Sequence, residues 1–171
     1  MREIAGLLIP ADDNTPIRRL GLDPADLQVW RRAVGGDLNH IPVPDPPCLF
    51  TVRQGTVHEG ANPDRLPFNH RATVLLSALY KPWATTGYLV GDAVITGHPD
   101  ARGEPVDVPD TLTKLLLHAR LFKAEVRLHG QQGWASNMMV FADWVSAATF
   151  VIDLGRRWTE VTATRIAVAD P

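Results

Sequence analysis

Residues 66–73 read LPFNHRAT, and residues 89–97 read LVGDAVITG. Asn69 stands directly before an apolar-periodic run, at the position where a side-chain oxygen accepts hydrogen bonds from the first helical N–H groups. One face of this run carries four apolar side chains at helical spacing, and these are Ala72, Leu75, Leu76 and Leu79. Pro82 cannot continue the helix. Residues 88–96 lie between two glycines, so the stretch predicts a loop, a capped helix and a strand.

The part of the chain before this stretch predicts a strand and a helix. Residues 4–9 are apolar, and Pro10 stops them. The helix signals follow, with Asp23 as N-cap and Pro24 at the first helical position. A pair of glycines after Val34 ends the helix, because glycine readily adopts the left-handed conformation that follows a last helical turn.

A proline-rich segment comes next. Residues 37–43 predict a short strand, and the prolines around it confine that strand to a sheet edge or a loop. The prolines are Pro42, Pro44, Pro46 and Pro47. Cys48 follows them as the only cysteine of the chain, and we expect it to be a small buried hydrophobic residue rather than a nucleophile.

The last part of the chain alternates helices and strands. Residues 100–109 are polar and contain proline, and we interpret them as a linker. Beyond them we expect a helix, a strand over 122–129 that alternates apolar and charged residues, a long helix over 137–158 and a strand over 161–168. The predicted fold is α+β, with an N-terminal mixed α/β domain (1–99) that has a short sheet, followed by a small C-terminal αβαβ unit (110–171).

Composition excludes several classes of protein. The 171 residues are 45% hydrophobic with a net charge of −2, and the basic residues do not gather, so nucleic-acid binding is not expected. One cysteine forms neither an intrachain disulfide nor a thiolate metal cluster. No apolar run is long enough to cross a membrane without charges. We expect a cytoplasmic protein with no cofactor and no metal.

Most sequence signatures of catalysis are absent. The chain has no phosphate-binding glycine–lysine loop, no dinucleotide-binding glycine pattern and no nucleophile elbow. His58 and Glu59 resemble the start of a zinc-peptidase helix, but Asn62 occupies the position of the second histidine. We therefore assign no catalytic residue, which leaves open an enzyme of a new kind.

Three tryptophans in the C-terminal part are candidate partner-binding residues. They are Trp134, Trp144 and Trp158. Exposed tryptophan is enriched at protein interfaces, and Trp144 lies toward the polar side of the predicted long helix. The alternative is that these side chains belong to the core or join one part of the chain to another.

Residues 1–100 resemble an uncharacterised domain family of actinobacteriophages, plasmids and actinobacteria. Four blocks occur here in the family's order: Ile-Pro-Ala-Asp at 9–12, Val-Gly-Gly at 34–36, Leu-Pro-x-Asn-x-Arg-Ala-Thr at 66–73 and Gly-Asp-Ala-Val-Ile-x-Gly at 91–97. Residues 38–40 depart mildly from the family's pattern, because the family often has an acidic residue and an aromatic-free strand at this place. The resemblance implies a mobile-element accessory protein made in the host cytoplasm and implies no reaction.

Two functional hypotheses follow. The first is a non-enzymatic phage or mobile-element accessory protein that binds a host protein, or its own copies, through exposed apolar surface, and so modulates the host or counters its defence. The alternative is a small-molecule binder or enzyme for an anionic, nucleotide-like ligand. That ligand would bind at Asn69, His70 and Arg71, because a helix N-terminus attracts anions. A DNA-binding or DNA-mimicking role fits the small net charge less well.

Overall fold

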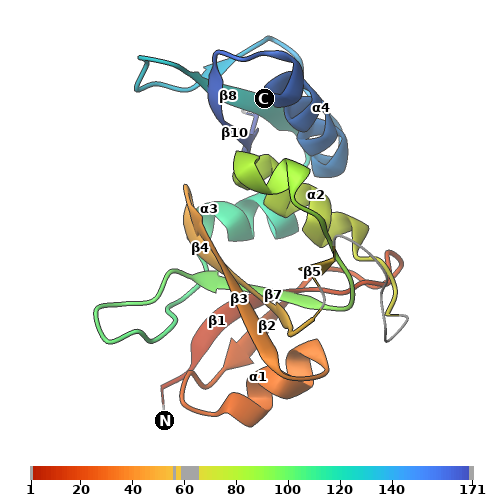
Figure 1. The fold of residues 1–171 in the computed structure, drawn as a ribbon, viewed down its shortest axis with the longest axis vertical. Coiled ribbons are helices and arrows are strands. Elements are labelled where there is room, and N and C mark those ends of the chain that lie inside the picture. The colour runs from red at the N-terminus through yellow and green to blue at the C-terminus, as the bar shows by residue number, and fades with distance from the viewer. Residues whose placement is uncertain (1, 56, 59–65, 170–171) are drawn as a thin grey trace. The chain divides into compact units, whose positions relative to one another are not determined.

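The computed structural model describes residues 2–55, 57–58 and 66–169 and has an α+β fold (Figure 1). The chain forms two compact units. The first comprises Met1–Thr73 with Gly87–Thr113, and the second comprises Val74–Thr86 with Lys114–Pro171. The domain boundaries expected from the sequence, 1–99, 100–109 and 110–171, stay a prediction.

The first unit contains a five-stranded antiparallel sheet among its described residues. Its strands in chain order are β1 (Ile4–Ile9), β2 (Arg18–Leu22), β3 (Leu38–Pro44), β4 (Pro47–Arg53) and β7 (Ala93–Gly97). Their order across the sheet is β2-β1-β7-β4-β3. β7 is the central strand, and all five of its residues are buried. β3 is an edge strand, which confirms the position expected from its prolines.

Residues 66–97 contain an α-helix, a 3-10 helix and two strands. α2 (His70–Leu79) follows Asn69, and the four apolar residues predicted for its face are all buried. A 3-10 helix, η1 (Lys81–Thr85), replaces the α-helix at Pro82. The single strand predicted over 88–96 is wrong. Gly91 has a φ of 73°, which breaks the segment into β6 (Tyr88–Leu89), paired with β5 (Val57–His58), and β7.

The helix predicted after Pro10 begins later than expected. Residues before it form β2, which the sequence did not predict, and a turn in which the Asp26 N–H donates to the Asp23 carbonyl at 3.2 Å. α1 (Leu27–Val34) then starts at Asp26, whose carboxylate accepts from the Gln28 N–H, so Asp23 is not the N-cap. Gly35 ends α1 with a φ of 78°, as predicted.

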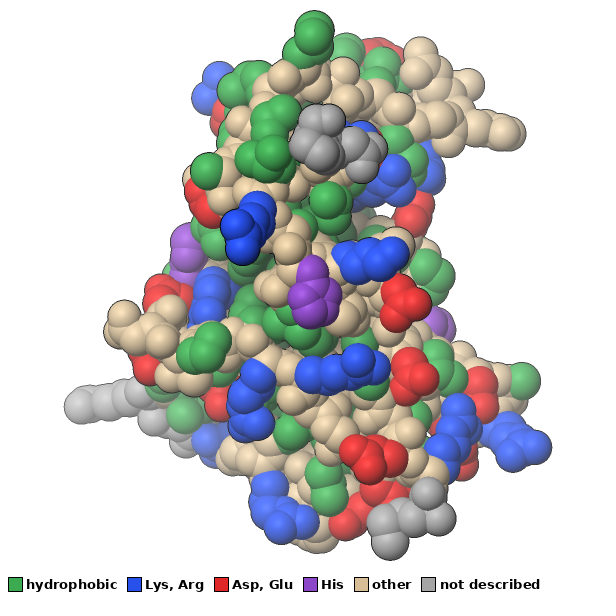
Figure 2. All heavy atoms as spheres, turned by 180° about the vertical axis from the view of Figure 1, so that it is seen from behind, with side chains coloured by type: hydrophobic (Ala, Val, Ile, Leu, Met, Phe, Trp, Pro, Cys, Tyr) green, Lys and Arg blue, Asp and Glu red, His purple; other side chains and the backbone are tan. Residues whose placement is uncertain are grey.

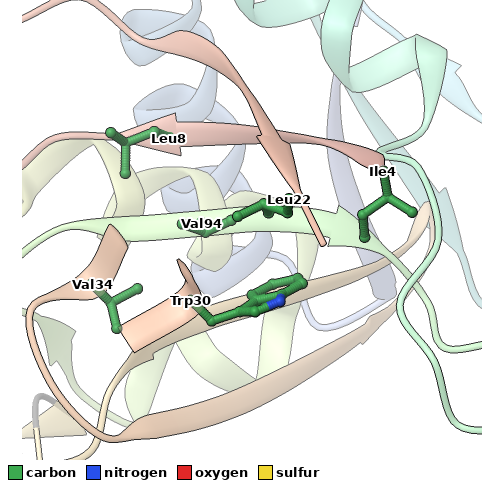
Figure 3. Close-up of a cluster of buried hydrophobic side chains, with 6 residues drawn as sticks. All are labelled: Ile4, Leu8, Leu22, Trp30, Val34 and Val94. Carbon is green, nitrogen blue, oxygen red and sulfur yellow. The ribbon is translucent and has the colours of Figure 1, made fainter. Parts of the chain in front are cut away.

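α1 closes a hydrophobic core on the sheet. Its two buried side chains, Trp30 and Val34, point toward apolar side chains of the strands (Figure 3). These strand residues are Ile4, Leu8, Leu22 and Val94. The Trp30 indole N–H donates to the Asp23 carbonyl at 2.9 Å, so the turn before α1 satisfies the one polar group that the core buries.

The second unit is a small α/β arrangement of the type predicted. After α3 (Asp110–Thr113), a π-helical turn, η2 (Lys114–His118), leads into it. Its sheet has the order β10-β8-β9, with β8 (Phe122–Leu128), β9 (Ala135–Ser136) and β10 (Val161–Val168), all antiparallel. α4 (Trp144–Arg157) lies along β8 and β10 (Figure 1), and its apolar face is formed by Ala147, Ala148 and Val151.

The predicted start of the long helix at Asn137 is wrong. α4 begins at Trp144, because the Asp143 carboxylate accepts from the N–H and the hydroxyl of Ser146, both at 2.7 Å. This is the geometry of an N-cap. Before Asp143, Phe141 pairs with Phe122 of β8 instead. Across the part of the chain that the structure describes, no helix is both long enough and apolar enough to cross a bilayer.

Candidate functional site

Asn69 uses its side chain entirely within the first unit. Its amide nitrogen donates to the carbonyls of Ile9 and Gly91 at 2.9 and 2.8 Å, and its amide oxygen accepts from the Ala72 N–H at 2.9 Å. The residue is completely buried. Asn69 therefore caps α2 and joins the end of β1 to the turn before β7.

Arg71 holds the turn that follows β1. Its Nη2 lies 2.8–2.9 Å from the carbonyl oxygens of Pro10, Asp12 and Thr15. Its Nε lies 3.4 Å from the Asp13 carboxylate, an ion pair that lacks hydrogen-bond geometry. Three carbonyls converge on one terminal nitrogen, so the guanidinium serves as a clamp on residues 10–15.

His70 is the exposed member of the three predicted ligand-binding residues. Its ring lies 6.0 Å from that of Phe68, which in turn makes an edge contact with Tyr88. The structure thus brings Asn69, His70 and Arg71 together at the start of α2, but it gives Asn69 and Arg71 partners inside the chain. The geometry favours a structural role for Asn69 and Arg71, and ligand binding at these three residues stays a prediction.

An apolar bulge precedes α4 in the second unit. Glu125 of β8 pairs with Ser136, and Phe122 of β8 exchanges two backbone hydrogen bonds with Phe141. Between these points β8 has two residues, 123 and 124, whereas the facing segment has four, 137–140. The extra residues must leave the sheet because both ends of the segment are held.

The residues that leave the sheet are hydrophobic. Met138 is fully exposed, and Met139 and Val140 are 47% and 55% exposed. The Asn137 side chain accepts from the Met139 N–H at 3.2 Å and shapes the turn. Two further exposed apolar residues, Leu121 and Val168, adjoin the Phe122 end of β8. We call this set, Leu121, Met138, Met139, Val140 and Val168, the apolar edge.

The three tryptophans do not form one patch. Trp144 is the first residue of α4 and Trp158 its C-cap, so the helix rise separates them by about 20 Å. Trp158 is 41% exposed, and Trp144 is half-buried. Trp134 lies on β8 and β10 side chains instead, with the guanidinium groups of Arg127 and Arg165 at 4.3 and 4.2 Å from its ring centroid.

A buried carboxylate organises the charged face of β8. Glu125 lies 2.6 Å from the Arg165 guanidinium and 3.1 Å from the Lys123 ammonium. Burial by itself raises the pKa of Glu125, but the hydrogen bonds and charges of Arg165 and Lys123 outweigh it, so the pKa lies below its ordinary value. The guanidinium of Arg165 therefore contacts both the Glu125 carboxylate and the Trp134 ring. We interpret this cluster as structural.

The chemically reactive groups are few among the described residues. Burial raises the pKa of the Cys48 thiol to about 12, so it is not a nucleophile at neutral pH; its predicted burial is confirmed. Burial lowers the pKa of His40, whose Nδ1 is 3.0 Å from the Thr51 hydroxyl. Across residues 2–55, 57–58 and 66–169, no three histidine, cysteine or acidic side chains gather as metal ligands would. His58 lies in the short strand β5, and Glu59 and Asn62 lie outside the described residues.

The sequence reasoning missed the apolar edge because it placed Met138–Val140 inside a helix. One signal was present: Asp143, a residue type favoured at helix N-caps, stands directly before the apolar run of α4. Reading that pattern as the helix start would have left three consecutive apolar residues outside any element.

Comparisons with known proteins add no family. No protein-family model matches the chain. No curated protein matches it, and no solved structure matches it. The resemblance of residues 1–100 to the phage and plasmid domain family stays a prediction.

Proposed function

We propose that this protein acts by binding another protein, without catalysis, and that the apolar edge is the contact surface. The observation that carries the proposal is the fully exposed Met138 within a run of three exposed apolar residues. Contiguous exposed apolar surface marks interaction sites in proteins that are otherwise folded normally. The context implied by the sequence resemblance is an accessory protein of a phage or mobile element that modulates its host or counters host defence.

Methionine suits such a surface. Its unbranched side chain and polarisable sulfur adapt to differently shaped partners. Burying one such side chain at an interface stabilises a complex by about 2 kcal/mol, which corresponds to a change in Kd of about thirtyfold. The bulge is held by backbone hydrogen bonds at Phe141, so the partner meets a segment whose ends are already ordered.

The charges on the surface fit a protein partner better than a nucleic acid. Basic and acidic side chains lie among one another on the face drawn in Figure 2. Affinity for nucleic acid depends on neutralising many phosphates with gathered basic residues. The net charge of −2 adds no such attraction.

The test compares two aspartate variants. Met138→Asp places a charge in the apolar edge, and Leu27→Asp places one at another exposed apolar position, on α1 of the first unit, where the side chain is 56% exposed. Tagged wild-type protein and both variants are used to capture proteins from actinobacterial lysate. The captured partner is identified by mass spectrometry, and its purified form is titrated against each variant.

We expect Met138→Asp to weaken the purified complex by about tenfold or more and Leu27→Asp to leave it unchanged. Light scattering of the protein alone shows whether a second copy is the partner, in which case Met138→Asp turns an oligomer into a monomer. A protein that captures nothing and is monomeric, or one whose complex is equally tight in both variants, contradicts the proposal.

A further inference from the structure

The second unit contains a cleft of about 550 Å³ that plays no part in the proposed function. α4, η1 and β10 form its walls. Clefts of roughly 300–1,000 Å³ are the size that binds small organic molecules. Every described residue that lines the cleft belongs to the second unit.

Two cations line the cleft. The Lys81 ammonium donates to the Val161 carbonyl, and the Arg156 guanidinium donates to the Ala84 carbonyl. A lysine has three N–H donors and an arginine five, so each side chain keeps donors for a further group. These two backbone bonds also hold both heads close to the cleft.

The described lining residues include no carboxylate to neutralise these cations. The acidic residue of α4 beside the cleft, Asp153, follows the lining residue Ile152, and its carboxylate is 2.9 Å from the Arg157 guanidinium. The lining side chains of the cleft therefore carry only positive charge, although the protein as a whole has a net charge of −2. A cleft lined by charges of one sign attracts ligands of the opposite charge.

The rest of the wall is apolar or hydroxylic. Ile152 and Ala84 supply apolar surface. Gly155 lets α4 approach β10 closely, because a Cβ at this position would lie 2.9 Å from the Thr164 methyl. The Thr164 hydroxyl donates to the Ala78 carbonyl and is thereby satisfied, so the inner wall presents mainly carbon to a ligand.

We propose that this cleft binds a small organic anion, with the anionic head on Lys81 and Arg156 and an apolar body against Ile152 and Gly155. The site is separate from the apolar edge and does not depend on the proposed protein binding. The anion sits between two charge-assisted hydrogen-bond donors, which are stronger than neutral ones.

The test titrates the full chain with 4-phenylbutyrate, its neutral analogue 4-phenylbutan-1-ol and inorganic phosphate, followed by calorimetry and NMR. We expect phenylbutyrate to bind at least tenfold more tightly than the alcohol, because the alcohol lacks the charge, and more tightly than phosphate, which lacks the apolar body. Equal binding of phenylbutyrate and the alcohol, or binding of neither, overturns the proposal.

Two variants locate the site. Arg156→Gln removes one cation, and we expect it to weaken phenylbutyrate binding about tenfold. Arg157→Gln is the matched control, because it removes the neighbouring charge, which pairs with Asp153 on the exposed side of α4. Thr85→Phe, at an exposed lining position of η1, obstructs the cleft without removing a charge and should abolish binding. Equal loss in Arg156→Gln and Arg157→Gln, or full binding by Thr85→Phe, places the ligand elsewhere and contradicts the assignment.

Discussion

Position 69 requires an amide side chain. Two carbonyls, those of Ile9 and Gly91, need donors, and the Ala72 N–H needs an acceptor. A carboxylate offers only acceptors and a hydroxyl offers a single donor, whereas asparagine offers two donors and an acceptor. Because the residue is completely buried, water does not replace a lost bond.

Asn69→Asp tests this requirement. The carboxylate keeps the cap on α2 but loses both donors and buries a charge beside two carbonyl oxygens. We expect a loss of about 3 kcal/mol in the free energy of unfolding, measured by urea denaturation. Asn137→Asp is the control, since its exposed side chain only accepts a hydrogen bond, and it should change stability by less than about 0.5 kcal/mol. Equal effects of the two substitutions would contradict the account.

Cys48 gives a second prediction at this scale. Burial raises the pKa of its thiol to about 12, so the reactive thiolate is scarce at about pH 8, near the pKa of a free thiol. We expect native protein to react with an aromatic disulfide reagent far more slowly than protein unfolded in guanidinium. Rapid labelling of the native protein would show that Cys48 is accessible.

The third residue-scale prediction concerns acid stability. Since the pKa of Glu125 is lower in the folded chain than in the unfolded one, its contribution to stability is present above the ordinary value near 4.5 and is lost as the pH falls through the lowered pKa. We expect Glu125→Gln to be less stable than wild type by about 2 kcal/mol at neutral pH. Denaturation curves at decreasing pH should show the difference in unfolding free energy between the two proteins shrinking. A constant difference across this pH range would contradict the assignment.

At the scale of elements, α4 depends on its cap. The Asp143 carboxylate accepts two hydrogen bonds from Ser146, and these bonds lower its pKa. We expect Asp143→Ala to cost about 1 kcal/mol in unfolding free energy. Asp153→Ala, which removes only an exposed i,i+4 ion pair with Arg157, should cost about 0.4 kcal/mol. Thermal unfolding of both variants compares them, and a larger loss in Asp153→Ala would argue against the cap.

Sequence patterns predicted the elements whose local signals agree with their surroundings. The apolar face of α2, the strands over 122–128 and 161–168 and the left-handed end of α1 at Gly35 were all predictable. Each depends on periodicity or on one special residue, which the sequence displays directly.

The elements that the sequence did not predict are set by distant pairing. β2 contains two arginines and a glycine, and it is a strand because it pairs with β1. Residues 138–141 fit a helical spacing with α4, yet Phe141 pairs with Phe122 in β8. The apolar edge arises from this competition, in which pairing with β8 overrides the helical spacing.

At the scale of the molecule, both proposed binding surfaces belong to the second unit. The first unit uses the side chains of Asn69 and Arg71 to secure its own sheet and turns. The second unit leaves Met138, Met139 and Val140 exposed and encloses a positively lined cleft. We propose a different partner for each feature, a protein for the apolar edge and a small anion for the cleft, and separate variants test the two proposals.

The most direct measurement is photo-crosslinking in actinobacterial cells with benzoylphenylalanine placed at position 138 or at position 27. Both positions are exposed and apolar, and only the first belongs to the apolar edge. We predict a discrete crosslinked product at position 138, containing one identified protein, and none at position 27. A product at position 27 alone, or none at either position, would contradict the account.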